Sequence, residues 1–447
     1  MKQAECSVWV ERDRKVIAPC QHLSYFPLVV ERADGDIITD ADGNTFIDFL
    51  TSASSLNLGS RNPVVMEAIR AQMDKCTQYT AAYTYNKPMT EYAERLISVY
   101  PGGVEAKVCF GNCGSDGNDA AVKFSRAFTG RRKIITFLNS YHGNTYGSST
   151  LSACTTRMSS GMGPFLPEVY HFPFYGADVD DAVCEAECLK DMEEAFNTSL
   201  PANEVAAVII EPMQGDGGLL PAHPIFMKKL YDLCRKNGIL FISEEVQQAF
   251  FRTGRWFSIE HYEGVVPDGI ILGKSVGAGL TLGAFMARKE IIDCLPAPAH
   301  LFTLGGNHLA CAAGNAAFDV MRGGDFQDLM ARNCASMERL CAGLREQHPG
   351  TVSFTRGLGM SVGVGVVKTA ADGTKTPDPD GAFKIIYRAY ENGLLIITVA
   401  GNVLRIQPPV NIAPEHLEQG FAIISQAMSD YEAGRIPDDV LSHRNGW

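Results

Sequence analysis

Three short runs of apolar residues, rich in β-branched side chains, constrain the fold more than any other feature of the sequence. They span residues 205–210, 239–242 and 269–272, and a stretch with helical periodicity, 226–237, lies between the first two. Short apolar runs of this kind are typical of strands buried on both faces. Strands that alternate with helices predict a parallel sheet with crossover helices on its faces. We therefore expect an α/β core in the middle of the 447-residue chain.

Both ends of the chain differ from this pattern. Alternating apolar residues in 28–49 surround the turn Asp42-Gly43-Asn44, which predicts a hairpin. Beyond residue 325, helical patterns flank strand-like segments at 361–367 and 394–398, and a last helix is expected from Pro414. We predict a small α+β domain built from both termini, residues 1–60 and 326–447, and a large α/β domain, residues 61–325.

The composition excludes several classes of protein. Hydrophobic residues make up 46% and charged residues 20% of the chain, which excludes disordered, collagen-like and coiled-coil proteins. Acidic residues outnumber basic residues by 51 to 39 and no basic run is present, so we expect no nucleic-acid partner. No stretch reaches the roughly 18 apolar residues that a membrane span needs, and the first residues lack the apolar segment of a signal peptide.

The thirteen cysteines are scattered and odd in number, which argues against a disulfide framework and for a reducing compartment. We therefore expect a cytoplasmic protein with no membrane partner. The pairs Cys109/Cys113 and Cys184/Cys188 have no matching pair of cysteine or histidine residues at the spacing of a zinc finger. We predict no metal site.

A glycine-rich turn, residues 111–119, precedes a helical pattern at 120–128 that ends at Gly130. The free backbone N–H groups at such a helix start bind anions, and Ser115 adds a hydroxyl donor, so the turn fits a phosphate group. A plain helix N-terminus is the alternative.

Polar and aromatic residues follow the expected strands. Tyr141 follows a strand at 133–138, at the edge where open α/β sheets bind ligands, and it fits a residue that stacks on a planar ring; an ordinary core tyrosine is the alternative. Glu211 and Glu244 follow two apolar strands, where a carboxylate needs a cationic partner or a proton. A solvated loop is the competing interpretation.

Lys274 follows the apolar strand 269–272. A lysine that is desolvated there has a lowered pKa and a free amine for Schiff-base chemistry. A nucleotide-binding P-loop is disfavoured, because Asp268 stands where that motif requires glycine. A phosphate cradle, a stacking ring, a buried carboxylate and a Schiff-base lysine together fit one ligand, pyridoxal phosphate.

The same residues resemble the class III, fold-type I aminotransferase family over nearly the whole chain. The resemblance rests on Asp42-Gly43-Asn44 with Ile47-Asp48, Gly114-Ser115-Asp116 with Asn118, Tyr141-His142-Gly143, Glu211-Pro212, Glu245-Val246-Gln247 with Arg252-Thr253-Gly254, Gly273-Lys274, Thr303 with Gly305-Gly306-Asn307, and Arg405 before Pro408-Pro409. Within the family the chain is most similar to the racemase branch of isoleucine 2-epimerases and α-amino-ε-caprolactam racemases, in 114–119, 297–303, 396–402 and the terminal Gly446-Trp447.

The resemblance implies a fold-type I architecture with pyridoxal phosphate as cofactor. Lys274 is implied to form the Schiff base, Tyr141 to lie on the ring face, Gly114 and Ser115 to bind the phosphate, and Gln247 to lie near the ring hydroxyl. Glu244 stands where the family usually has Asp, the group that keeps the pyridine nitrogen protonated; its extra methylene shifts either the cofactor or the strand end.

The resemblance also implies how the subunits and the substrate are arranged. Thr303 is implied to reach the phosphate of a neighbouring subunit, so we expect a homodimer or a dimer of dimers. Arg405 resembles the arginine that binds a substrate α-carboxylate, a bidentate task for which lysine is a poor substitute. Tyr25 and the loop 52–55 occupy segments that line the substrate site in related enzymes, although plain scaffold is the alternative for both.

Asp216 is the residue on which the choice between a racemase and an aminotransferase depends. Many ω-aminotransferases have Glu at this position, whereas an Asp in the racemases is implied as an acid/base group on the face opposite the lysine. Two proton carriers on opposite faces of Cα invert its configuration. We expect an amino-acid racemase or 2-epimerase acting on apolar α-amino acids. The alternatives are an aminotransferase, in which the lysine alone moves the proton, and a cofactor-binding protein without catalytic activity.

Overall fold

The computed structural model describes residues 1–444, and the terminal Gly446-Trp447 of the racemase resemblance lie outside the described residues. The contacts divide the chain into two compact units: a large unit, Pro63–Gly323, and a small unit formed by Met1–Asn62 and the chain from Gly324 onward. Among residues 1–444, no helix combines the length and the apolar character that a membrane crossing requires.

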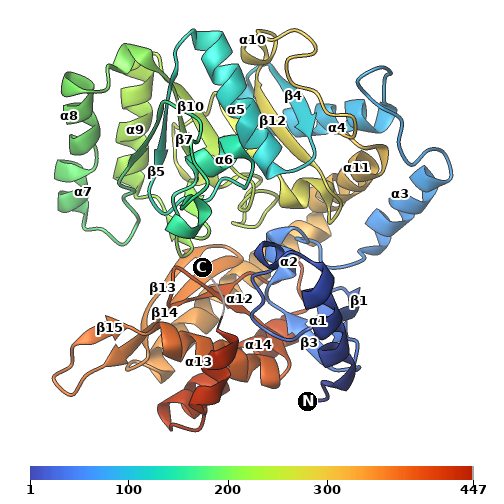
Figure 1. Ribbon diagram of the computed structural model, residues 1–447, viewed down its shortest axis with the longest axis vertical. Coiled ribbons are helices and arrows are strands. Elements are labelled where there is room, and N and C mark those ends of the chain that lie inside the picture. Colours follow the sequence, from blue (N-terminus) through green and yellow to red (C-terminus); the bar gives the residue numbers. More distant parts are fainter. Residues whose placement is uncertain (445–447) are drawn as a thin grey trace. The chain divides into compact units, whose positions relative to one another are not determined.

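A seven-stranded, mostly parallel sheet forms the centre of the large unit (Figure 1), as the sequence predicts. Only β12 runs against its neighbours, β11 and β4. The strands, in spatial order, are β4 (Ala106–Gly111), β12 (Gly283–Arg288), β11 (Gly269–Leu272), β10 (Leu240–Glu244), β7 (Val205–Ile210), β5 (Lys133–Phe137) and β6 (Val169–Phe172).

Helices cover the faces and ends of this sheet. They are α3 (Pro63–Met73), α4 (Lys87–Ser98), α5 (Gly114–Thr129), α6 (Tyr146–Leu151), α7 (Asp181–Glu187), α8 (Lys190–Thr198), α9 (Pro224–Asn237), α10 (Lys289–Ile292) and α11 (His308–Arg322). In Figure 1, α7, α8 and α9 gather toward the end of the sheet where β5 lies, and α3, α4 and α11 gather toward the end where β4 lies.

The local sequence explains where these elements begin and end. Every residue of β7 is buried, which is why the strand contains only Val, Ala and Ile. Helix α9 begins at Pro224 and is ended by Gly238, whose φ of +61° is a left-handed conformation that glycine adopts without strain. Helix α5 ends in the same way at Gly130, but it begins at Gly114, six residues before the predicted helical pattern.

The small unit contains two sheets and the longest helices. The first sheet has the order β1 (Val30–Asp34), β2 (Ile37–Asp40), β3 (Thr45–Asp48) and β16 (Leu394–Leu395). The second has the order β13 (Val352–Leu358), β14 (Ser361–Thr369), β18 (Val403–Ile406) and β17 (Ile397–Val399), with β15 (Lys375–Pro377) beside β14. The helices are α1 (Ala4–Val16), the short α2 (Thr51–Ser54), α12 (Gly324–Gln347), α13 (Pro379–Glu391) and α14 (Pro414–Glu432).

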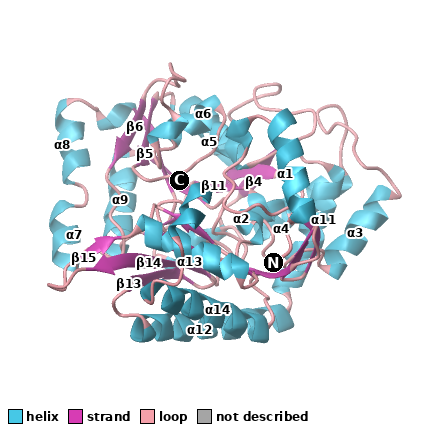
Figure 2. Cartoon of the chain, turned by 60° about the horizontal axis from the view of Figure 1, so that its bottom comes forward, coloured by secondary structure: helices cyan, strands magenta, loops and turns pink. Residues whose placement is uncertain are grey.

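Two predictions for the small unit are confirmed and one is wrong. β2 and β3 form the predicted hairpin, and α14 begins at Pro414 as expected. The segment 394–398, predicted as one strand, is instead divided: β16 pairs with β3 in the first sheet, whereas β17 pairs with β18 in the second. The chain changes sheets at Ile396, which a continuous run of apolar residues does not reveal. Figure 2 shows α12 and α14 side by side beneath β13 and β14.

A packing contact in the large unit holds the segment that follows β11. Tyr92 of α4 donates a hydrogen bond to the carbonyl of Val276 at 2.6 Å, and Val276 lies in the 3-10 helix Lys274–Gly277. Gly314 of α11 lies directly against the Tyr92 ring, where an added Cβ would come within 2.4 Å of Cε1. The absence of a side chain at Gly314 is therefore necessary for the position of this tyrosine.

We expect Gly314→Ala to lower the free energy of unfolding by about 1–3 kcal/mol, because the added methyl group overpacks the contact with Tyr92. Urea unfolding followed by circular dichroism measures this change. Gly343→Ala in α12 is the control, since the nearest atom to its added Cβ is 3.8 Å away. The gain in helix propensity should leave that variant neutral or more stable by up to about 1 kcal/mol. Equal losses in both variants would contradict the packing argument.

Candidate active site

The carboxyl ends of neighbouring strands bring most of the predicted site residues together in the large unit. Strands β5, β7, β10 and β11 are parallel, so the segments that follow them meet at one edge of the sheet. Tyr141 follows β5, Asp216 lies beyond β7, Glu244 ends β10, and Lys274 follows β11. All four side chains are buried or half-buried.

The amino terminus of α5 is a suitable site for an anion. Its N-cap residue, Cys113, provides no side-chain hydrogen bond to the first turn, so the N–H groups there are not capped by a side chain of their own helix end. The Ser115 hydroxyl accepts a hydrogen bond from the Asn144 N–H at 3.2 Å. Gly114 and Ser115 thus face the loop that follows Tyr141, and the helix dipole favours a negative charge at this point.

Gly143 allows these two segments to approach closely. Its φ is +127°, and an added Cβ would lie 2.1 Å from the Ser115 Oγ and 2.6 Å from the Ser148 Oγ. Gly273 has a similar effect on the other side, because its Cβ would lie 2.9 Å from the Gly114 Cα. The backbone just before Lys274 therefore packs directly against the start of α5. Lys274 itself has a φ of +48°.

Glu244 is a buried carboxyl group with an unusual electrostatic environment. Burial, together with the nearby carboxylate of Glu211, raises the pKa of Glu244 well above its ordinary value, and the charge of Lys274 opposes this increase. The Asn118 Nδ2 lies 3.4 Å from its Oε1. A buried carboxyl group in this state takes up a proton or pairs with a cation.

Glu211 connects two of the segments at this edge. Its Oε1 accepts a hydrogen bond from the Tyr141 N–H at 2.9 Å, and its Oε2 accepts one from the Gly215 N–H at 2.9 Å. Burial raises the pKa of Glu211 to about 7, although the two N–H donors act in the opposite direction. The sequence singled out this carboxylate but gave it no role, because its partner Tyr141 is 70 residues away.

Asp216 and Gln247 lie on adjacent segments of this site. Asp216 is 8% exposed, and its charge contributes to raising the pKa of Tyr141 to about 12, for which burial is the main cause. Gln247 is also buried, and an added Cβ on Gly215 would lie 2.2 Å from its Oε1. The segment that contains Asp216 therefore packs against Gln247, and Glu211 joins it to the backbone of Tyr141.

Asn118 is a structural residue of the site to which the sequence analysis gave no role. It is completely buried in α5, and its Nδ2 donates hydrogen bonds to the carbonyls of Gly114 and His142, both at 3.0 Å. It thereby joins the helix start to the loop after β5. Its place in the Gly-Ser-Asp-Gly-Asn motif could have indicated this role, because the side-chain amide of Asn118 lies on the buried face of the helix.

Thr303 lies apart from these residues, in an exposed turn. Its carbonyl accepts a hydrogen bond from the Gln78 Nε2 at 3.2 Å, and Gln78 also accepts one from the Asn307 Nδ2 at 3.0 Å. The loop that contains Gln78 is thus held to the turn that contains Thr303. The two segments that contain Gln78 and Thr303 also expose large apolar side chains, namely Tyr79, Tyr83, Tyr85, Leu301 and Leu304.

Tyr25 and Arg405 belong to the small unit, where they are close to the same pair of strands. Arg405 lies in β18, opposite Ile397 of β17, and it is buried. The Tyr25 hydroxyl donates a hydrogen bond to the carbonyl of Thr398 at 2.7 Å. The structure therefore brings the two predicted substrate-binding residues to one sheet of the small unit.

The segment 51–54 of the small unit has an unusual backbone. Thr51, Ser52, Ala53 and Ser54 all have φ values between +47° and +66°, a left-handed turn without glycine. The Asp48 Oδ1 accepts a hydrogen bond from the Thr51 N–H at 2.7 Å, and the Thr51 Oγ1 donates one to the Gln407 carbonyl at 2.9 Å. A left-handed conformation costs a residue with a side chain roughly 1–2 kcal/mol, and such strain is concentrated at functional segments.

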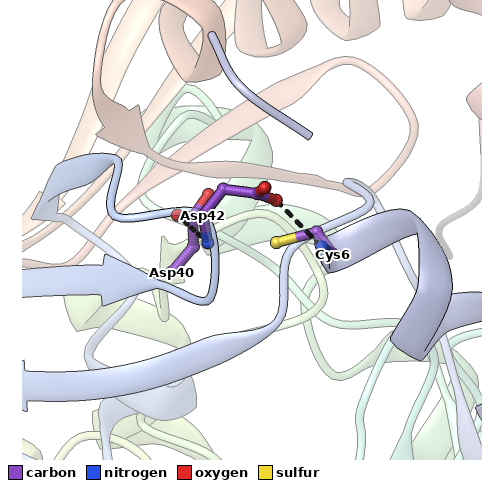
Figure 3. A group of neighbouring side chains, drawn as sticks. All are labelled: Cys6, Asp40 and Asp42. Carbon is purple, nitrogen blue, oxygen red and sulfur yellow. Dashed lines mark hydrogen bonds between the residues drawn. The ribbon is translucent and has the colours of Figure 1, made fainter. Parts of the chain in front are cut away.

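One group of potential metal ligands occurs among residues 1–444, namely Cys6, Asp40 and Asp42 of the small unit (Figure 3). Asp42 accepts hydrogen bonds from the Glu5 and Cys6 N–H groups at 2.9 and 2.8 Å, at the start of α1. Asp40 accepts hydrogen bonds from the Asp42 and Asn44 N–H groups in the hairpin turn. The carboxylates thus fix the hairpin and cap the helix.

Comparisons with known proteins agree with this geometry. The profile of the family described as aminotransferase class-III matches residues 19–428. The chain is 38% identical to isoleucine 2-epimerase of Lentilactobacillus buchneri, over 100% of both chains, and 35% identical to leucine/methionine racemase of Thermococcus litoralis, over 98% of this chain and 99% of that one. The solved structure of taurine:2-oxoglutarate aminotransferase from Bifidobacterium kashiwanohense, in complex with PLP and glutamate, has a TM-score of 0.87 and 27% identity, over 97% of this chain and 99% of that one.

We expect Gly143→Ala to weaken the binding of pyridoxal phosphate, the cofactor expected from the sequence, by at least about tenfold, because the new methyl group would displace the Ser115 hydroxyl. Absorbance titration of the cofactor-free protein measures the affinity. Gly161→Ala is the matched control: Gly161 also has a positive φ, +77°, but nothing lies within 4 Å of its added Cβ. An equal loss of affinity in the two variants would assign the effect to backbone strain and contradict the role of the Ser115 contact.

Proposed function

The chain belongs to the class-III aminotransferase family, and we propose that within it the protein is a pyridoxal-phosphate-dependent racemase or 2-epimerase of α-amino acids with apolar side chains. The observation that carries the proposal is the similarity, over the complete length of both chains, to an isoleucine 2-epimerase. The similarity to a racemase of leucine and methionine supports the same substrate class.

The residues at the carboxyl edge of the sheet fit pyridoxal phosphate. The start of α5, which has no side-chain cap, suits the phosphate group. Burial and the nearby Glu211 carboxylate raise the pKa of Glu244, and a cationic pyridinium nitrogen beside Glu244 would stabilise its ionised form. Bound pyridoxal phosphate withdraws electrons from the Cα of an attached amino acid, which makes its α-hydrogen acidic.

We assign the cofactor-binding roles to residues of the large unit. Gly114 and Ser115 would hold the phosphate, Tyr141 would lie against the ring, and Glu244 would pair with the ring nitrogen. Gln247 would contact the ring hydroxyl, and Lys274 would hold the cofactor through its ε-amine. The position of Tyr141 after β5, at this edge of the sheet, supports its role, since an aromatic ring can stack on a planar group.

The proposed stereochemical step depends on two proton carriers. Lys274 removes or returns the α-proton on one face of Cα, and Asp216 does so on the other, so that the configuration inverts. The charges of Asp216 and Lys274 both act on the pKa of Glu211, which supports their presence around a common centre. In the small unit, Arg405 would bind the substrate carboxylate in a bidentate manner, and Tyr25 would contribute to the substrate pocket.

An aminotransferase is the second candidate, favoured by the structural similarity to the taurine:2-oxoglutarate enzyme. In that reaction Lys274 alone would carry the proton, and a 2-oxo acid would be required as acceptor. A group on the Asp216 face would then have no proton to transfer.

We expect the purified enzyme to invert isoleucine, leucine or methionine without a 2-oxo acid. In deuterium oxide the product should carry deuterium at Cα, because the returning proton comes from solvent. Chiral chromatography with mass spectrometry measures both events. Asp216→Asn should reduce inversion by roughly 10²–10⁴-fold, the usual contribution of a general acid or base. Strict dependence on a 2-oxo acid, with no enantiomer formed, would instead identify an aminotransferase.

We further propose that the enzyme is a homodimer and that Thr303 reaches the cofactor phosphate of the partner subunit. Support comes from the exposed apolar side chains around Thr303 on two loops that Gln78 joins together. An apolar surface rimmed by polar residues is typical of a protein–protein interface, in which tyrosine is enriched.

We expect Tyr83→Glu to increase the dissociation constant of the dimer by at least about tenfold, because an aromatic side chain that the proposed dimer would bury is replaced by a charge. Analytical ultracentrifugation over a dilution series measures it, and the affinity for pyridoxal phosphate should decrease in parallel if Thr303 acts across the interface. Val183→Glu in α7 is the control, since Val183 is also exposed but lies in a helix at the other end of the sheet. Monomeric wild-type enzyme with full cofactor affinity would refute the role of Thr303.

A cytoplasmic location is inferred from the cysteines. All thirteen are free in the structure, and six of them are buried in positions where a free thiol packs as a small apolar side chain: Cys6, Cys184, Cys188, Cys234, Cys311 and Cys341. Free thiols in this number are typical of a reducing compartment.

A further inference from the structure

Glu211 contacts the backbone beside two proposed site residues, Tyr141 and Asp216. It is not one of the groups proposed to transfer the proton. Each of its carboxylate oxygens accepts one backbone N–H: that of Tyr141, which follows β5, and that of Gly215, which precedes Asp216. One side chain therefore fixes the backbone of the residue proposed for the ring face and of the segment that carries the proposed acid/base group.

The surrounding contacts reinforce this connection. The Gln214 Nε2 donates a hydrogen bond to the Leu138 carbonyl at 2.8 Å, so the same two loops are joined a second time. A side chain on Gly215 would collide with Gln247, and one on Gly217 would lie 2.5 Å from the Gln214 Oε1. The loop that carries Asp216 is thus closely packed at Gly215 and at Gly217, and the Glu211 carboxylate binds its backbone.

A second buried carboxylate, whose hydrogen bonds go to other segments, is present nearby for comparison. Glu245, the residue after Glu244, is also completely buried. Its carboxylate accepts hydrogen bonds from the hydroxyls of Ser243 and Ser258 and from the N–H groups of Ser258 and Ile259. None of these partners is a proposed site residue, so Glu245 provides a matched control.

We propose that Glu211 is a positioning residue, which holds Tyr141 and Asp216 in register so that a proton can be delivered on the Asp216 face. This inference rests on the proposed racemase function. It predicts a specific defect: without Glu211, the proton on the Lys274 face is still exchanged with solvent, while inversion is impaired. A residue needed only for folding would reduce both processes together.

The ionisation of Glu211 gives the proposal a pH dependence. Burial raises its pKa to about 7, and the N–H groups of Gly215 and Tyr141 lower it. The charge of Asp216 raises this pKa and that of Lys274 lowers it. Glu244 and the Cys154 thiol are further acidic groups that interact with Glu211. The ionised form accepts both N–H groups. The two connections are therefore complete above pH 7, and one is weakened as the pH falls through 7 and a carboxylate oxygen takes up a proton.

The first test uses Glu211→Gln, which retains one acceptor oxygen and replaces the other with an NH₂ group that cannot accept. Hydrogen exchange of the full chain, with and without pyridoxal phosphate, should show a roughly tenfold to hundredfold loss of protection at the Tyr141 or Gly215 amide. In Glu245→Gln the loss should occur at Ser258 or Ile259 instead. Unchanged protection at both Tyr141 and Gly215 would overturn the proposal.

The second test measures the ratio of α-deuterium exchange to inversion for each enantiomer. Glu211→Gln should raise this ratio by about tenfold or more for one enantiomer, whereas Glu245→Gln should leave it unchanged. In the wild-type enzyme the ratio should rise as the pH falls from about 8 to about 6, and in Glu211→Gln it should stay flat. An equal change in the two variants, or a ratio independent of pH in the wild type, would overturn the positioning role.

The two tests separate the failure of this inference from the failure of the proposed function. If the wild-type enzyme forms no enantiomer, the racemase function is wrong, and the hydrogen-exchange test still decides whether Glu211 holds both loops. If Glu211→Gln does not fold, hydrogen exchange of the wild-type enzyme decides: protection of the Tyr141 or Gly215 amide, which Glu211 binds, should decrease between about pH 8 and about pH 6, and unchanged protection of both would overturn the proposal.

Discussion

The removal of two carboxyl groups from water is the constraint on which the rest of the site depends. Strands β7 and β10 are buried throughout, and Glu211 and Glu244 stand at their carboxyl ends, 5% and 3% exposed. Each carboxyl group there must receive hydrogen bonds, a cation or a proton. Glu211 receives two backbone N–H groups, whereas the contact of Glu244 with the Asn118 Nδ2 is long, at 3.4 Å. The difference fits two roles, one carboxyl group engaged by the protein and the other facing a cationic ligand.

The glycines at this edge follow from the same requirement. For segments after β5, β7 and β11 to reach the buried carboxyl groups, their backbones must pass close to one another. Gly143 lies against Ser115, Gly215 against Gln247, and Gly273 against the Cα of Gly114. A side chain at any of these three positions would collide with a neighbour before the loops closed, so the motifs that the sequence shows are consequences of packing as much as of ligand binding.

The sequence predicts the parts of this structure that depend on local patterns. The apolar strand β7 and the positions of Tyr141, Glu244 and Lys274 after their strands follow from burial and from the rule that parallel strands end at one edge. The left-handed turn 51–54 was not predictable, since none of its residues is glycine. Asp48 holds the turn locally, and the Gln407 carbonyl, which is distant in sequence, holds it from another strand end. The division of 394–398 between two sheets and the bond from Tyr141 to Glu211 were missed for the same reason: the partners are far apart along the chain.

The loop that contains Asp216 is held by residues of the large unit. It is held by Glu211 to Tyr141 and by Gln214 to Leu138, and it packs on Gln247. Lys274 belongs to the same unit, so both groups proposed to move the α-proton are fixed by one hydrophobic core, whereas Arg405 and Tyr25 are fixed by another. In the proposed racemase, the choice between inversion and transamination would depend on the short loop after β7, which carries Asp216. The residues proposed to bind the substrate carboxylate and to line the pocket, Arg405 and Tyr25, belong to the small unit.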